Sequence, residues 1–132
     1  MKTKTIKQNV SFKASPHEVF EALMDEKKHA GFTGAKAKIS RKINGKFSVY
    51  DNGIFGKTIE LEKDKKIVQE WYCEDENWPE GHFSKLIITF AKSGTGTKLS
   101  MVHEKVPEGA AKSIALGWKD YYWKPMKEML EK

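Results

Sequence analysis

The hydrophobic pattern of this chain changes its period once, near residue 108, and this change limits the possible folds more than any other feature. Before that point, apolar residues alternate with polar ones in short runs, as they do in half-buried strands. After it, apolar residues recur every three or four positions, at Ala111, Ile114, Ala115, Trp118, Tyr122, Met126 and Met129. This spacing predicts one amphipathic helix from about Gly109 to Leu130. Pro125 lies inside the helix and is expected to kink it near the carbonyl of Tyr121.

The part of the chain before this helix is predicted to form short strands joined by turns. Strands are expected at residues 5–12, 35–42, 46–50, 54–62, 66–72, 83–90 and 97–104. Asn44-Gly45 predicts a type I′ hairpin turn, and Asp51-Asn52-Gly53 predicts a second hairpin. Strands at such regular spacing indicate a meandering antiparallel sheet.

Two short helices are expected after the first strand. Ser15 suits the N-cap, Pro16 the first helical position and Glu18 the reciprocal position of a capping box. The first helix should end near Met24, and residues 25–34 should form a second short helix or a turn.

This order of elements predicts an α+β fold of the helix-grip type. In this fold one long helix covers the concave face of a curved antiparallel sheet, here of about six to seven strands. The length of 132 residues is usual for one domain, so residues 1–132 are expected to form a single domain. Because one helix often leaves part of a wide curved sheet uncovered, an apolar cavity is expected between the two.

Nine residues are expected to line this cavity, because strand alternation and helical spacing place them on the inner side. They are Trp71, Leu86, Ile88, Phe90, Leu99, Met101, His103, Trp118 and Tyr122. His103 is the polar residue among apolar neighbours, so it is either a core histidine with its hydrogen bonds satisfied or a contact that orients a ligand. For Trp71 and Trp118, ordinary core packing is the alternative to pocket lining.

The charge of the chain is positive and uneven. Of its 24 basic residues all but Arg41 are lysine, which argues against sequence-specific recognition of nucleic acid, since base readers rely on bidentate arginine. Residues 1–46 hold eleven basic and four acidic side chains (+7), and the remainder holds thirteen and fourteen (−1). The excess is either a solvated surface or a docking patch for an acidic partner, with Lys36, Lys38, Arg41 and Lys42 as the expected contacts.

The sequence predicts no catalytic residue, no metal site and no cofactor, and therefore no enzyme. The four histidines form no metal-binding motif, and Cys73 with His82 would supply too few ligands for zinc. No apolar run is long enough to span a membrane, and no secretory signal follows Met1. With a single cysteine, the chain is expected to be cytosolic.

Several short motifs resemble one known family. In chain order they are Ser15-Pro16 with Val19-Phe20, Gly45-Lys46-Phe47, Gly53 and Gly56, Ile67-Val68-Gln69 with Trp71, Trp78-Pro79-Glu80-Gly81-His82-Phe83, Gly96-Thr97-Lys98-Leu99, and Gly117-Trp118 with Tyr121-Tyr122. Their order over nearly all of the chain resembles the activator of heat-shock-protein-90 ATPase homologue family, within the START-like (SRPBCC) helix-grip superfamily. The segment 78–83 is especially similar to the C-terminal domain of the eukaryotic co-chaperone.

This resemblance leaves three classes of function open. The first is a non-enzymatic domain that holds a small apolar ligand between the sheet and the helix, as other members of the superfamily do. The second is a chaperone-associated interaction domain. Weak or no stimulation of the chaperone is expected for it, because the family's co-chaperones use a separate N-terminal domain for which this chain has no room. The third is a cyclase- or aromatase-like enzyme, for which only His103 is a candidate group.

Overall fold

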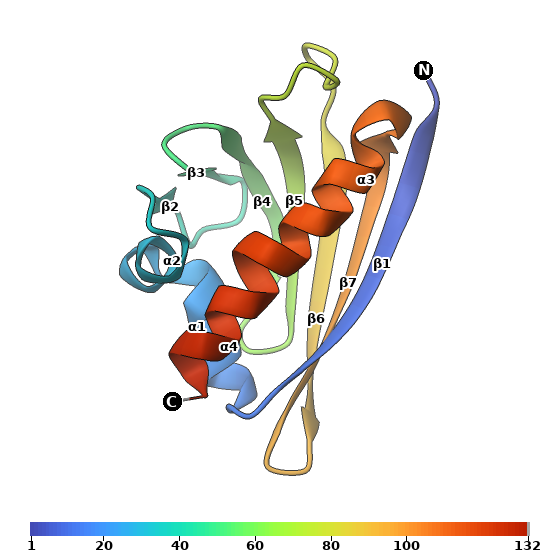
Figure 1. Ribbon diagram of the computed structural model, residues 1–132. Coiled ribbons are helices and arrows are strands. Elements are labelled where there is room, and N and C mark those ends of the chain that lie inside the picture. The colour runs from blue at the N-terminus through green and yellow to red at the C-terminus, as the bar shows by residue number, and fades with distance from the viewer. Residues whose placement is uncertain (132) are drawn as a thin grey trace.

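Seven strands form one antiparallel sheet, and a long C-terminal helix crosses its inner face (Figure 1). The computed structural model describes residues 1–131. In chain order the strands are β1 (Thr3–Phe12), β2 (Lys38–Ile39), β3 (Gly45–Val49), β4 (Ile54–Glu62), β5 (Lys66–Cys73), β6 (Ser84–Ser93) and β7 (Gly96–Pro107). Their spatial order is β1-β7-β6-β5-β4-β3-β2, so only β1 pairs out of sequence. The predicted curved antiparallel sheet of a helix-grip fold is confirmed.

The two short helices after β1 are confirmed, together with their caps. In α1 (Pro16–Met24), Ser15 and Glu18 form the predicted reciprocal capping box. In α2 (Glu26–Thr33), the Asp25 side chain accepts a hydrogen bond from the backbone of Lys28, and Gly34 ends the helix in the left-handed conformation. Figure 1 shows α2 beside β2, whereas α1 lies behind the end of the C-terminal helix and contacts β6, β7 and that helix.

The C-terminal helix runs without interruption through α3 (Glu108–Gly117), η1 (Trp118–Trp123) and α4 (Lys124–Leu130). Where Pro125 was expected to cause a kink, η1 is a π-helical segment, in which the backbone N–H of Lys124 donates to the carbonyl of Lys119, five residues earlier. Pro125 has no N–H for the carbonyl of Tyr121, and the Tyr50 hydroxyl donates to that carbonyl instead, at 3.0 Å. A wider turn and a tyrosine therefore accommodate the proline.

The expected strand at residues 35–42 is mostly wrong, because only Lys38–Ile39 pairs, with β3. The backbone N–H of Ile39 donates to the Glu26 carboxylate, which turns this segment toward α2. The type I′ turn at Asn44-Gly45 is also wrong, since only Asn44 has a positive φ, of 64°. Gly45 is needed there because a Cβ would overlap the Ser40 side chain.

The second hairpin turn, between β3 and β4, is confirmed. Asp51 and Asn52 both have positive φ, of 54° and 75°, and the N–H of Gly53 donates to the carbonyl of Tyr50. Within residues 1–131, no helix combines the length and the apolar character that a bilayer crossing requires.

Candidate functional site

All nine residues expected to line a cavity are buried between the sheet and the helix. Five of them border a common cavity, namely Trp71, Leu86, Ile88, Trp118 and Tyr122. The other four, Phe90, Leu99, Met101 and His103, pack in the core away from it. The volume of this cavity is about 30 Å³. Since one water needs about 10–15 Å³ on the same measure, this space has room for about two waters.

His103, at the inner face of β7, has both ring nitrogens hydrogen-bonded. The Trp118 indole N–H donates to Nδ1 over 3.1 Å, so the ring proton lies on Nε2, which faces Ser84 Oγ at 2.7 Å. The Ser84 hydroxyl then donates to the carbonyl of Trp71. Burial lowers the pKa of His103 to about 3, so the imidazole stays neutral. Of the two alternatives for this residue, the arrangement is that of a core histidine with its hydrogen bonds satisfied.

His29, on α2, is a second buried histidine that the sequence did not single out. Its Nε2 lies 3.0 Å from the Tyr122 hydroxyl, and both residues border the 30 Å³ cavity. Its Nδ1 is buried without a partner among residues 1–131. Burial lowers the pKa of His29 to about 4 and raises that of Tyr122. The polar segment around His29 gave no signal of burial, since the burial comes from packing against the distant C-terminal helix.

A larger groove of about 140 Å³ opens beside this cavity. It shares Trp71, Trp118 and Tyr122 with the cavity, so these three aromatic side chains form the wall between the two spaces. The remaining lining residues of the groove are Tyr50, Ile54, Cys73, Asp75, Ser113, Ile114, Gly117 and Tyr121. Alternation alone did not predict it, because it depends on how the β3–β4 turn meets the π-helical segment.

The expected basic patch is exposed, but its arginine is already paired. The Arg41 guanidinium donates two hydrogen bonds to Glu21, of 2.8 and 2.6 Å, and lies 5.8 Å from the ring centre of Phe20. These bonds hold the pKa of Glu21 below its ordinary value. Lys36, Lys38 and Lys42 are exposed and form no ion pair with any other residue in the range 1–131.

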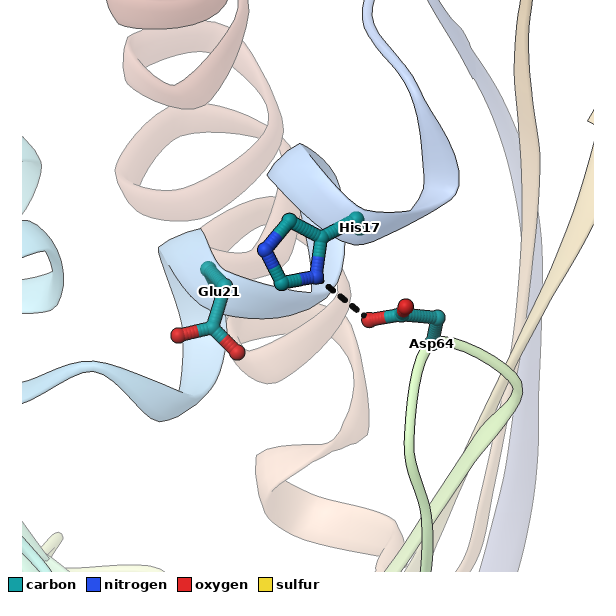
Figure 2. Close-up of side chains that lie close together, drawn as sticks. All are labelled: His17, Glu21 and Asp64. Atoms are coloured by element: carbon teal, nitrogen blue, oxygen red, sulfur yellow. Dashed lines mark hydrogen bonds and ion pairs between the residues drawn. The ribbon is translucent and has the colours of Figure 1, made fainter.

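One group of potential metal ligands lies next to this pair (Figure 2). His17 and Glu21 come from α1 and Asp64 from the β4–β5 turn, with their ligand atoms within 4.8 Å of one another. Figure 2 shows the His17 Nδ1 directed at Asp64, at 3.0 Å. Because Arg41 already binds both oxygens of Glu21, the group is better described as two neighbouring side-chain pairs, Arg41 with Glu21 and His17 with Asp64.

Known proteins are similar to this chain in sequence and in fold. The family described as "Activator of Hsp90 ATPase homolog 1-like protein" matches residues 13–131. The chain is 31% identical over 125 residues to an uncharacterized protein of Schizosaccharomyces pombe, covering 95% of this chain and 37% of that protein. It is 30% identical over 118 residues to the human activator of 90 kDa heat shock protein ATPase homolog 1, covering 89% and 34%.

A solved structure titled as an HSP90 activator from Plasmodium falciparum superimposes with a TM-score of 0.89 over 96% of each chain, at 24% identity, and shows the same fold. The chain spans about a third of the length of the curated relatives it matches. The family match covers all the elements after β1 and the relatives align over most of the chain. The chain therefore belongs to the activator of Hsp90 ATPase homolog 1-like family.

Proposed function

We propose that residues 1–132 act as one non-enzymatic, cytosolic interaction domain for a chaperone of the heat-shock-protein-90 class. The nearly filled interior carries this proposal. A domain with about 30 Å³ of space in its core, and a groove of only about 140 Å³ beside it, presents its surface, and not an inner chamber, to a protein partner. The human relative, which aligns over 89% of this chain, is named as an activator of such a chaperone's ATPase.

The absence of catalysis is part of this proposal. General acid–base chemistry needs a group that can exchange a proton with a bound substrate near neutral pH. Burial lowers the pKa values of His103 and His29 to about 3 and about 4, and His103 has no nitrogen free. A cyclase-like enzyme would need such a group to face an open chamber.

The exposed lysines Lys36, Lys38 and Lys42 are the proposed contacts with an acidic surface of the chaperone. Isothermal titration calorimetry of the whole chain with the chaperone, at low and moderate salt, tests this. The variant Lys36→Glu/Lys38→Glu should bind at least ~10-fold more weakly and lose much of the salt dependence. The charge-matched control Lys92→Glu/Lys98→Glu, on the β6–β7 hairpin, should bind like the parent. Equal losses in both variants would argue against a defined patch, and no binding by the parent chain would refute the chaperone proposal.

A small apolar ligand is the second candidate, and the 140 Å³ groove supports it. An apolar cavity of about 150 Å³ in another protein binds benzene, so a single aromatic ring is the expected size. Burying roughly 150 Å² of such a ring gains about 4 kcal/mol before ordering costs, which corresponds to millimolar affinity at best.

This candidate is tested by tryptophan fluorescence against a panel of single-ring compounds, because Trp71 and Trp118 border the groove. Ile114→Phe should fill the groove and remove the response. Leu116→Phe is the matched control, since Leu116 lies on the same helix, is exposed and does not line the groove. A response that survives Ile114→Phe, or no response from the parent chain, would argue against binding in the groove.

A further inference from the structure

Strand β1 is an edge of the sheet with one side unpaired. It pairs with β7 from Thr3 to Phe12, and no strand follows it in the spatial order. Among residues 1–131, the β1 backbone makes hydrogen bonds with β7 alone. An edge of ten residues with free N–H and C=O groups is a template on which another extended segment can pair.

A groove of about 330 Å³ runs between this edge and the C-terminal helix. On the strand side it is lined by Gln8, Asn9 and Val10. Successive side chains of a strand point to opposite faces, so a hollow that contacts three consecutive residues reaches along the edge of the strand. Lys119, Trp123, Lys124 and Lys127 line the helix side.

Gln8 fixes the spacing between the two walls of the groove. Its side-chain amide donates to the carbonyl of Ala115 at 3.0 Å, and its side-chain carbonyl accepts from the Trp123 indole at 2.7 Å. Two hydrogen bonds from one side chain to two turns of the helix hold the strand edge and the lysines in a set position. The groove is thus formed before a partner arrives, which lowers the entropy cost of binding.

Every charged residue that lines the groove is a lysine. Lys119, Lys124 and Lys127 are exposed and form no ion pair with residues 1–131. The strand adds exposed Lys4 and Lys7. A second copy of β1 would bring its own lysines against these and be repelled, whereas an acidic segment would be attracted.

We propose that the free edge of β1 binds an extended acidic peptide segment of another protein as an eighth strand, with its acidic side chains facing Lys119, Lys124 and Lys127. Backbone hydrogen bonds to β1 supply the pairing, and alternate side chains supply the selectivity. This surface is separate from the patch at Lys36, Lys38 and Lys42. It binds such a segment whether or not the chaperone proposal is correct.

The test uses the whole chain and a fluorescent eight-residue peptide with glutamate at every second position. Nuclear magnetic resonance should place the largest shift changes at residues 6–11 and 119–127. Lys119→Gln/Lys124→Gln/Lys127→Gln should weaken binding at least ~10-fold, by removing three charge contacts. Lys36→Gln/Lys38→Gln/Lys42→Gln removes the same net charge elsewhere and should leave the affinity unchanged.

A second pair of peptides tests strand pairing separately from charge. One peptide is methylated at the backbone nitrogens that face β1, and the other at the alternate nitrogens, which face away. The first methylation should abolish binding and the second should leave it intact. Equal effects of the two methylation patterns would overturn the eighth-strand geometry. Equal losses in the two lysine variants, shift changes confined to residues 36–42, or no binding by the parent chain would overturn the proposal as a whole.

Discussion

The β7 side and the α2 side of the interior each bury one histidine, and the two are treated differently. On the β7 side, His103 bonds with Trp118 and Ser84 and has no free nitrogen. On the α2 side, His29 borders a 30 Å³ cavity and bonds with Tyr122, while its Nδ1 has no protein partner among residues 1–131. Burial lowers the pKa of both.

The difference shows in which part of the interior the buried polar groups all have protein hydrogen-bond partners, and in which part they do not. The His103 network joins the three strands β5, β6 and β7 to the helix through polar groups that are all paired, so it adds specificity at little cost. The Nδ1 of His29 has no protein partner among residues 1–131, so a hydrogen bond to it would have to come from a water in the adjacent 30 Å³ cavity. We therefore expect the α2 side to be the softer part of the core.

Among the substitutions that test this comparison, replacing His103 should lower the free energy of unfolding the most. His103→Ala leaves a cavity and removes the partners of the Trp118 indole and the Ser84 hydroxyl, so the free energy of unfolding should fall by about 4 kcal/mol. Urea unfolding followed by circular dichroism measures it. His29→Ala should cost clearly less, because one of its nitrogens has no partner to lose. A loss from His29→Ala as large as that from His103→Ala would break the comparison.

Lowering the pH should destabilise both sides. Burial holds the pKa at about 3 for His103 and at about 4 for His29, while in the unfolded chain histidine titrates near 6.5. Below pH 6.5 the unfolded state binds more protons, so stability is lost as the pH falls and the loss levels off at each folded pKa. At pH 5 each histidine should cost about 2 kcal/mol.

Urea midpoints between pH 7 and pH 4.5 measure this dependence. In His29→Phe, the slope between pH 6 and pH 5 should fall to about half of the parent slope. An unchanged slope would mean that His29 is not held neutral in the folded protein.

A smaller change separates the hydrogen bonds of the His103 network from its packing. Ser84→Ala removes one hydroxyl and leaves His103 Nε2 and the carbonyl of Trp71 without that partner. The expected loss is about 2 kcal/mol in the free energy of unfolding, measured by thermal or urea denaturation. Ser100→Ala is the control, since Ser100 on β7 donates to Asn9 on β1 at a more exposed site and should cost less than ~1 kcal/mol. Equal costs would show that burial of the network adds nothing.

The smallest change in the free energy of unfolding is expected when His29 and Tyr122, which are hydrogen-bonded to each other, are replaced together. His29→Phe/Tyr122→Phe removes the hydrogen bond and also the unpartnered Nδ1, and keeps two rings of similar size. The free energy of unfolding of the double variant should lie within about 1 kcal/mol of the parent value. The losses of the two single variants, added together, should exceed the loss of the double variant. A double-mutant cycle in urea measures this coupling. Strict additivity would mean that the contact between these residues contributes nothing.

The sequence predicted those features that depend on local pattern. Alternation identified the inner faces of β6 and β7, the capping box identified the start of α1, and His103 stood out as the polar residue of an apolar face. Features that depend on distant contacts were not predictable in this way. His29 packs against Tyr122, 93 positions away, and the N–H of Ile39 in the short strand β2 donates to Glu26, 13 positions away.

The volume of the cavity could not be predicted from the sequence either. It depends on how the rings of Trp71, Trp118 and Tyr122 pack against one another. The pairing of Arg41 with Glu21 was missed for the same reason. A formal charge count assigns Arg41 to a patch, whereas the folded chain brings a carboxylate to it from α1.

The π-helical segment at Trp118–Trp123 also affects how the chain can change in length. A π turn corresponds to one residue inserted into an α-helix. In an ordinary α-helix, deletion of one residue turns everything downstream by about 100° and moves an apolar stripe off its partner. Deletion of Lys119 or Asp120, both exposed, would instead convert this turn to regular α geometry and keep Met126 buried. A one-residue deletion should therefore be tolerated in this segment but not in α3, where it would rotate the whole remainder of the helix.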